Sequence, residues 1–190
     1  MLMEDTGVEY EVDTDVGGWT NGPKGGGSRN EDYPCFRPPL LVHGGVTIAQ
    51  CPAMLEYLGK LTGRIPADPA AQAHCLQLCC DAVDFFDEWY RGFLADKGEE
   101  YSKGDRFDCW LNVFEKSVGT NAFGTDVPYY GEFHLLCCLR GLEWVVGSGG
   151  APALGSAYAK AIAKRPKLTA WKRGIESRPR IAAYIAASGE

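Results

Sequence analysis

The stretch PPLLVHGGVTIAQCPAMLEYL, residues 38–58, decides the fold that this sequence predicts. Residues 40–42 are a short apolar run, and the His-Gly-Gly of residues 43–45 supplies the glycines that a tight hairpin turn needs for its positive φ angles. Residues 46–49 have the pattern of a second short strand. A helix follows, because apolar residues recur at helical spacing after Pro52, and a first helical turn tolerates proline. The stretch therefore predicts a β-hairpin that leads directly into a helix.

This stretch resembles the glutathione-binding half of the glutathione transferase family, in which a cis proline opens the third strand and a Gln/Glu-Ser pair begins the third helix. By this resemblance Pro39 takes the place of the cis proline, and Gln50 and Cys51 take the places of the Gln-Ser pair, without a gap between them. The resemblance continues through FHLLCCLRGLEWV (residues 133–145) and PKLTAWKRGIESRPRIAAYIAAS (residues 166–188). Both look like late helices of the family's all-α second domain.

The resemblance implies an α+β/α two-domain fold. A partial thioredoxin-like, glutathione-binding domain is expected over residues 1–62, and an all-α helical bundle is expected over residues 70–190. The linker GRIPADP at residues 63–69 joins them, because its Gly and Pro residues break helices. Within the bundle, apolar spacing predicts helices over residues 70–94 and 105–117.

A further helix over residues 133–146 is apolar nearly all round, which indicates burial at the centre of the bundle. In the family this helix begins with a Ser/Thr-x-x-Asp capping box. Here Glu132 keeps the acidic position, but Tyr129 cannot cap in the same way. We therefore expect Thr125 or Asp126 to provide the cap, with an earlier start of the helix.

The beginning of the chain departs from the family. The first strand and the loop after it carry the Tyr, Ser or Cys that activates the glutathione thiol in relatives, whereas MLMEDTGVEYEV (residues 1–12) looks like the end of the first helix followed by the second strand. No catalytic residue is therefore assigned. In the family the first strand lies between the second and the third, so residues 8–12 are expected to lack partners for backbone groups, at about 1–3 kcal/mol for each one that is buried. We expect either a sequence without its natural first segment or a loosely held N-terminal stretch.

The glutathione-binding residues that the resemblance implies are Pro38, Pro39, Gln50 and Cys51. The residue before the cis proline pairs its backbone with the cysteinyl unit of glutathione, but Pro38 offers only a carbonyl because proline has no N–H. Gln50 and Cys51 would hold the γ-glutamyl carboxylate with the N–H groups of a helix start. Three alternatives stay open: Gln50 satisfies backbone groups at a strand end, Cys51 is a small buried filler, or Cys51 is a reactive thiol with a depressed pKa.

Other candidate contacts rest on the resemblance alone. Trp19 and Lys24 could approach the glycine end of glutathione, or could simply belong to the surface loop over residues 13–34. The pocket for the electrophile would draw on Tyr90, Phe93 and Tyr101.

Four acidic residues lie off the apolar stripe of the helix over residues 70–94. They form either a solvated acidic face or, at one position, a contact with the glutathione amino group; the four are Asp81, Asp84, Asp87 and Glu88.

Composition excludes several classes of function. A net charge of −6 argues against nucleic acid or an anionic membrane surface as a partner, and no apolar run is long enough for a transmembrane helix. None of the eight cysteines forms a Cys-x-x-Cys pair, so we expect no metal site. Those at positions 75, 79, 80, 137 and 138 fall on predicted helices and are expected to be buried thiols, which fits a reducing, cytoplasmic location.

The sequence thus predicts a cytosolic glutathione transferase, a homodimer that conjugates the thiol of glutathione, its substrate, to small electrophiles in detoxification. The alternative is a non-catalytic module of the same fold that serves protein assembly or ligand binding, and a weaker idea is glutathione-dependent redox or storage work. Because no thiol-activating residue is assigned, we expect negligible turnover from this chain.

Overall fold

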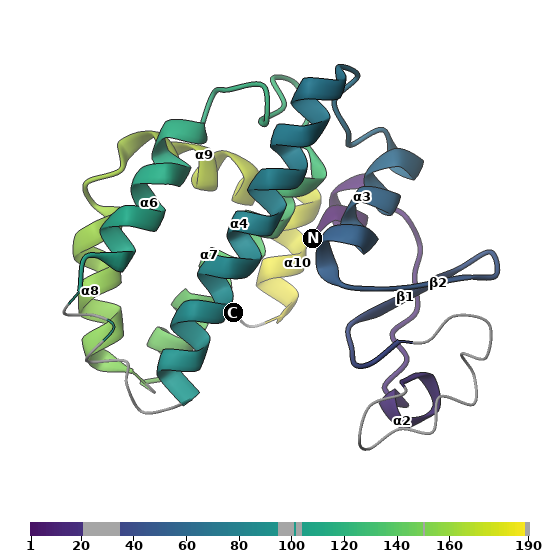
Figure 1. Ribbon diagram of the computed structural model, residues 1–190, viewed down its shortest axis with the longest axis horizontal. Helices are drawn as coiled ribbons and strands as arrows, with labels where there is room; N and C mark the ends of the chain where they lie inside the picture. Colours follow the sequence, from purple (N-terminus) through teal and green to yellow (C-terminus); the bar gives the residue numbers. More distant parts are fainter. Residues whose placement is uncertain (21–34, 95–100, 102–103, 150, 189–190) are drawn as a thin grey trace.

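The computed structural model describes residues 1–20, 35–94, 101, 104–149 and 151–188. Within these ranges the chain is mostly helical, with one small two-stranded antiparallel sheet (Figure 1). The elements, in order, are α1 (Leu2–Thr6), α2 (Val16–Trp19), β1 (Leu40–His43), β2 (Val46–Ala49), α3 (Cys51–Thr62), α4 (Pro69–Leu94), α6 (Arg106–Ser117), α7 (Tyr130–Gly147), α8 (Pro152–Ile162), α9 (Pro166–Glu176) and α10 (Pro179–Ser188).

The predicted hairpin and the helix after it are confirmed. β1 pairs with β2 in a register that sets Leu40 opposite Ala49. Gly44 and Gly45, with φ of 56° and 81°, form the turn, as two-residue hairpin loops require. α3 starts immediately after β2, and its C-cap is Gly63 in the left-handed conformation, with φ of 69°.

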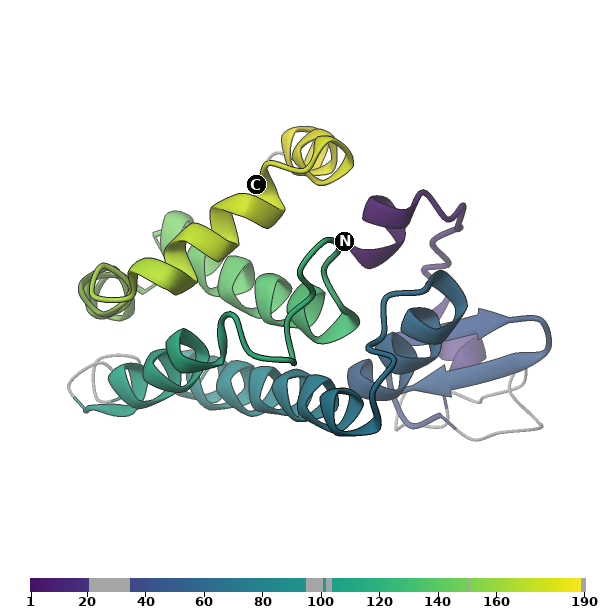
Figure 2. The same ribbon diagram turned by 90° about the horizontal axis from the view of Figure 1, so that it is seen from above.

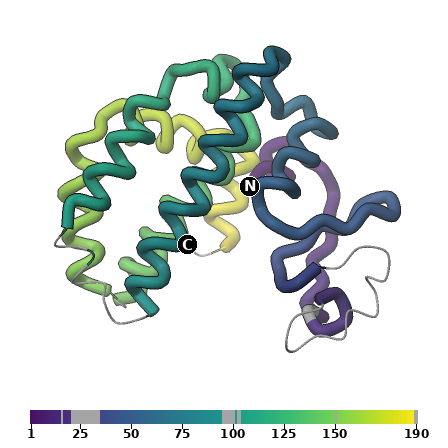
Figure 3. Tube along the Cα trace, viewed as in Figure 1, coloured from purple at the N-terminus to yellow at the C-terminus, as the bar shows by residue number. Residues whose placement is uncertain are grey.

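The helical part has a core of its own, built on α4, α6, α7, α8 and α9. Phe85 and Trp89 of α4 are fully buried there with Leu111 and Phe114 of α6. The rings of Phe85 and Phe114 meet edge to face, with centroids 5.6 Å apart. α7 runs along α4, as the tube trace in Figure 3 also shows, and its Leu139 is fully buried between the neighbouring helices. The prediction that α7 lies at the centre of the bundle is therefore confirmed.

A second apolar cluster joins the first part of the chain to the bundle. It contains Leu2 of α1, Leu58 of α3, Phe133 and Leu136 of α7, and Ile181 of α10. Figure 2 shows α1 and α10 side by side, so the two ends of the described chain lie close together.

An ion pair network reinforces this junction. The Asp5 carboxylate is only 3% exposed and pairs with Arg178, in the turn between α9 and α10, and with Arg64, just after α3. Arg64 Nη2 lies 2.7 Å and Arg178 Nη2 lies 3.1 Å from Asp5 Oδ2. One carboxylate therefore ties together three segments that are far apart in sequence.

The predicted early start of α7 is wrong. α7 begins at Tyr130, and its N-cap is Tyr129 rather than Thr125 or Asp126. The buried Glu132 carboxylate makes this start possible, because its Oε2 accepts the N–H of Tyr129 at 2.7 Å and the N–H of Gly124 at 2.8 Å. The acidic half of the capping box is thus enough to fix the helix start, without a hydroxyl cap.

The predicted strand over residues 8–12 is also wrong. These residues belong to no strand, because the only sheet in the described part contains β1 and β2. The loop expected over residues 13–34 includes a short helix, α2, and residues 21–34 lie outside the described part.

The predicted fold class is confirmed: a partial thioredoxin-like unit, reduced to a hairpin and α3 with α1 beside it, precedes an all-helical bundle. The domain bounds at residues 62 and 70 stay a prediction. Among the described residues, no helix combines the length and the apolar character that crossing a bilayer demands.

Candidate functional site

The Pro38–Pro39 peptide bond is cis and stands immediately before β1. Both prolines line a groove that is bordered by β1, by residues 8–13 and by one side of α3. The structure therefore places Pro39 as the resemblance implies, at the entrance of the strand.

Gln50 adopts a strained backbone conformation. Its φ of 72° and ψ of 115° make it the only non-glycine residue with positive φ among those described. Such a conformation costs roughly 1–3 kcal/mol and is concentrated at functional sites. This conformation turns the backbone from the end of β2 into the start of α3. Gln50 is the N-cap of α3, and its carbonyl accepts the N–H of Met54 at 3.0 Å.

The N-terminus of α3 has no side-chain cap within the described part of the chain. The first N–H groups of a helix have no partner inside the helix and carry a partial positive charge, so they attract an anion. Because Pro52 has no N–H, the available donors of this turn are those of Cys51 and Ala53.

A cavity of about 380 Å³ opens beside Gln50, between α3 and α4. Its lining includes the N-cap Gln50, three residues of α3 (Pro52, Ala53 and Glu56) and four residues of α4 (Leu76, Cys80, Val83 and Asp84). A helix N-terminus thus lies next to two carboxylates, Glu56 and Asp84. This arrangement suits a ligand end that carries both a carboxylate and an ammonium group.

The structure separates the four acidic residues of α4 that the sequence could not distinguish. Asp84 lines the cavity beside Gln50. Asp87 pairs with Arg91 of the next helical turn at 2.7 Å, and the Glu88 carboxylate accepts the Trp110 Nε1–H at 3.0 Å and also pairs with Arg106. Asp81 does not line the cavity, and partial burial raises the pKa of its carboxyl.

Cys51 is half-buried at the start of α3. Burial raises the pKa of its thiol, and the opposing effect of its own N–H is smaller. The interpretation of Cys51 as a reactive thiol with a depressed pKa is therefore wrong. The helix N-terminus does lower a thiol pKa in general, but desolvation is the larger effect here.

The other cysteines divide into two groups. Cys75, Cys79 and Cys138 are buried, as predicted, and burial raises the pKa of Cys75 to about 11. Cys80 and Cys137 are exposed, against the prediction, because each follows or precedes a buried cysteine by one residue and so lies on another side of its helix.

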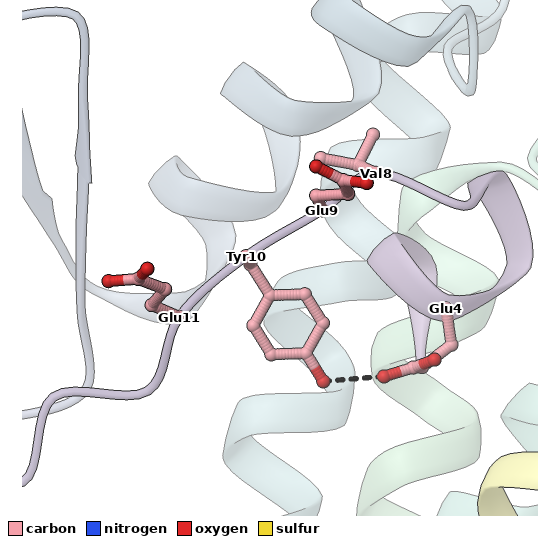
Figure 4. A pocket seen from close by; sticks show the side chains of 5 residues that line it. All are labelled: Glu4, Val8, Glu9, Tyr10 and Glu11. Atoms are coloured by element: carbon pink, nitrogen blue, oxygen red, sulfur yellow. Dashed lines mark hydrogen bonds between the residues drawn. The ribbon is translucent and has the colours of Figure 1, made fainter.

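Tyr10 provides a hydroxyl on the groove that Pro38 and Pro39 also line. Its hydroxyl donates to Glu4 Oε1 (Figure 4), and this bond is the largest cause that raises the pKa of Tyr10 to about 12. A hydroxyl that is committed to a carboxylate and has a raised pKa is poorly suited to stabilising a thiolate.

Two further predicted contacts can be placed only in part. Trp19 lines the groove with the two prolines, and its Nε1–H donates to Asp13 Oδ2 at 2.8 Å. Lys24 lies outside the described residues.

The three aromatic residues predicted for the electrophile pocket come from the end of α4 and from position 101. Tyr90 stacks on Phe86 with ring centroids 5.3 Å apart, and Phe93 and Tyr101 are partly buried against the helical core. The ring centroids of Tyr90 and Phe93 lie 6.4 Å apart, whereas the ring of Tyr101 contacts Phe107 at 5.0 Å. None of the three lines the cavity beside Gln50.

Sequence reasoning did not find Glu56 as a residue of the site, and it could not select Asp84 from the four acidic residues of α4. A signal for Glu56 was present, because it follows Pro52 by four residues and so lies on the same face of α3. Asp84 depends on how α4 packs against α3, which spacing along one helix does not reveal.

Comparison with known proteins supports the fold. The structure is similar to the crystal structure of a glutathione S-transferase from Ascaris lumbricoides, with a TM-score of 0.70 and 18% sequence identity over 98% of this chain and 88% of the other. It is also similar to the prostaglandin synthase D of Nilaparvata lugens, with a TM-score of 0.66 and 16% identity over 97% of this chain and 88% of the other. No family model and no curated protein matches the sequence.

The chain therefore has the glutathione transferase fold, as the resemblance in the sequence implies. At sequence identities of 16–18% this similarity establishes the fold alone, so the function must be argued from the residues of the site.

Proposed function

We propose that this protein binds glutathione beside Gln50 and acts as a glutathione transferase-like protein that conjugates the glutathione thiol to small electrophiles. The observation that carries the proposal is the strained Gln50 at the uncapped start of α3, in a chain with the glutathione transferase fold.

The γ-glutamyl end of glutathione fits the charges of the cavity. Its carboxylate would accept the N–H groups of Cys51 and Ala53 and the side-chain amide of Gln50. Its ammonium would lie near Glu56 or Asp84, which line the same cavity. Since Glu56 also pairs with Lys60 at 2.8 Å, Asp84 is the better partner for the ammonium.

The cysteinyl unit would lie toward the Pro38–Pro39 bond, where the Pro38 carbonyl is the available backbone group. An extended peptide that pairs its backbone with this segment would bind as an added strand does. Cys51 would supply its N–H rather than its thiol, because a thiol is a weak donor.

The proposal includes four properties that rest on the resemblance. They are a homodimer, domain bounds at residues 62 and 70, a cytoplasmic location and a role in detoxification. None of the eight cysteines is in a disulfide, which suits a reducing compartment.

A non-catalytic glutathione-binding module is the second candidate. The observation that favours it is that two groups both have raised pKa values: the hydroxyl of Tyr10, on the groove that Pro38 and Pro39 line, and the thiol of Cys51, at the start of α3. Neither environment favours the anionic form, whereas activation of a thiol requires donors that stabilise a thiolate.

The test is a conjugation assay with glutathione and a chlorodinitrobenzene electrophile, combined with a calorimetric titration of glutathione. Binding with turnover above the uncatalysed rate supports the transferase, and binding without turnover supports the non-catalytic module. A protein that shows no saturable glutathione binding would contradict both candidates.

A further inference from the structure

Residues 160–180 reverse the charge of the chain. They contain eight of its 19 lysines and arginines but only one, Glu176, of its 25 acidic residues. The remaining residues are therefore strongly acidic, since the whole chain has a net charge of −6. A local excess of one charge attracts partners of the opposite charge.

Half of these eight cations have a carboxylate partner within the protein. Arg165, Lys172 and Arg178 form ion pairs, and Lys164 Nζ lies 3.7 Å from Asp108 Oδ2. The other four are exposed and form no ion pair in the described part of the chain; they are Lys160, Lys167, Arg173 and Arg180.

Three of these four exposed cations remain available to a partner. The guanidinium of Arg180 lies against Gly7, at the end of α1, and so already has a place in the fold. Lys160 is in the last turn of α8, and Lys167 and Arg173 lie near the two ends of α9. Figure 2 shows α8, α9 and α10, yellow-green to yellow, in succession along one side of the molecule, with no other described element on their outer side.

The position of Lys167 is not explained by the stability of its helix. Cations are favoured in the last turn of a helix and disfavoured in the first, by about 0.3–1 kcal/mol each. Lys160 and Arg173 follow this preference, whereas Lys167 is the second residue of α9 and opposes it. Glu115 of α6 accepts the backbone N–H of Lys167 at 3.2 Å, but it forms no ion pair with the ammonium within the described part.

The surface between Lys167 and Arg173 is shallow. The exposed residues of α9 between and beside them include Ala170 and Gly174, and nothing lies within 4 Å of a Cβ atom added at Gly174. At 100° per residue Lys167 and Arg173 lie on the two edges of this exposed side, with Ala170 between them. A partner can therefore lie close to α9 while both cations reach it from the edges.

The size of this surface decides which kind of anion fits it. The 11 residues of α9 rise only about 16 Å. A nucleic acid duplex or an anionic bilayer extends beyond this length and would meet the acidic remainder of the chain, which repels it. A short acidic segment of a protein contacts the basic residues alone.

We propose that the outer side of α9, together with Lys160 of α8, docks an acidic helix of another polypeptide. Carboxylates of that helix pair with Lys160, Lys167 and Arg173, and its small residues lie over Ala170 and Gly174. This inference does not depend on glutathione binding, because the cavity beside Gln50 is lined by α3 and α4 and not by α8 or α9.

The test uses the full chain and a labelled synthetic peptide of Ala and Glu, in which Glu recurs every three or four residues so that the carboxylates share one helix face. Fluorescence anisotropy is expected to show saturable binding that weakens at least tenfold between about 50 mM and about 300 mM salt. Two control peptides are expected to bind at least tenfold more weakly: one has Lys in place of Glu, and the other keeps the charge but has two central prolines that prevent a helix.

Charge-reversed proteins provide the matched controls. K167E/R173E is expected to bind the Ala-Glu peptide at least tenfold more weakly, and its fold should persist because one change suits its helix end and the other opposes it. K60E/R91E changes the net charge equally at exposed positions of α3 and α4 and should bind the peptide as the natural protein does.

Three results would overturn the proposal. The first is that the Ala-Glu peptide does not bind saturably, or binds no better than the peptide with prolines. The second is an equal loss of binding in the two double variants, which would show a general effect of net charge. The third is that a short DNA duplex or vesicles of anionic lipid displace the peptide and bind more tightly, which would assign the surface to nucleic acid or to a membrane.

Discussion

Replacing Gly131 by alanine tests how closely α7 and α4 pack. A Cβ atom at Gly131 would lie 2.6 Å from the carbonyl oxygen of Cys75 and 3.2 Å from its Sγ atom. Alanine favours a helix over glycine by about 1 kcal/mol. Overpacking costs about 1–3 kcal/mol, and the high end applies here because a backbone carbonyl cannot rotate away. The net expectation is a loss of about 2 kcal/mol.

Thermal unfolding measures this loss. For a chain of this size about 2 kcal/mol corresponds to a Tm lower by roughly 4–8 °C. Gly174→Ala is the matched control, because Gly174 is in helix α9 with nothing within 4 Å of the added Cβ, and it should raise stability by about 0.5–1 kcal/mol. If Gly131→Ala were as stable as Gly174→Ala, the packing of α7 on α4 described above would be refuted.

Three further substitutions have defined outcomes. Asp5→Asn should lower the free energy of unfolding in urea by about 2–3 kcal/mol, because it leaves the guanidinium groups of Arg64 and Arg178 without their carboxylate. An unchanged urea midpoint would contradict the role of the ion pair network. Glu132→Gln should cost about 1–3 kcal/mol, because its amide group must face either the Trp171 N–H or the two backbone N–H groups, and equal stability would show that these bonds are dispensable. Burial lowers the pKa of His134 below 6.5, so its contribution to stability is present above pH 6.5 and is lost as the pH falls through the lowered value. A His134→Gln variant should therefore lose stability less steeply than the natural protein below pH 6.5, and parallel pH profiles of the two would refute this.

Much of the fold could be predicted from local signals. The hairpin follows from Gly44 and Gly45, and the start of α3 follows from Pro52, because each residue imposes a backbone conformation by itself. The strand over residues 8–12 could not be judged in this way, since a strand exists only when another strand pairs with it. The start of α7 was missed because Glu132 acts through Gly124, in the preceding loop, as well as through Tyr129.

The site was predictable to a similar extent. The positions of Pro38, Pro39 and Gln50 follow from their order along one continuous stretch. The choice of Asp84 over its neighbours depends on how α4 packs against α3 and is visible only in three dimensions. The sequence also left open whether Cys51 is a reactive thiol, because the burial that raises its pKa and outweighs the local effect of its N–H is visible only in three dimensions.

The most direct test of the central claim is a calorimetric titration of glutathione into the natural protein and into Gln50→Gly. Glycine removes the side-chain amide, keeps the backbone N–H groups and relieves the strain at φ of 72°, so the variant should be at least as stable as the natural protein. Loss of one hydrogen bond to a charged group, worth about 1.5–3 kcal/mol, predicts binding that is roughly 10–100-fold weaker, whereas Gln77→Ala, away from the cavity lining, should bind normally. Equal affinity of Gln50→Gly and the natural protein, or no saturable binding to the natural protein, would contradict the proposed site.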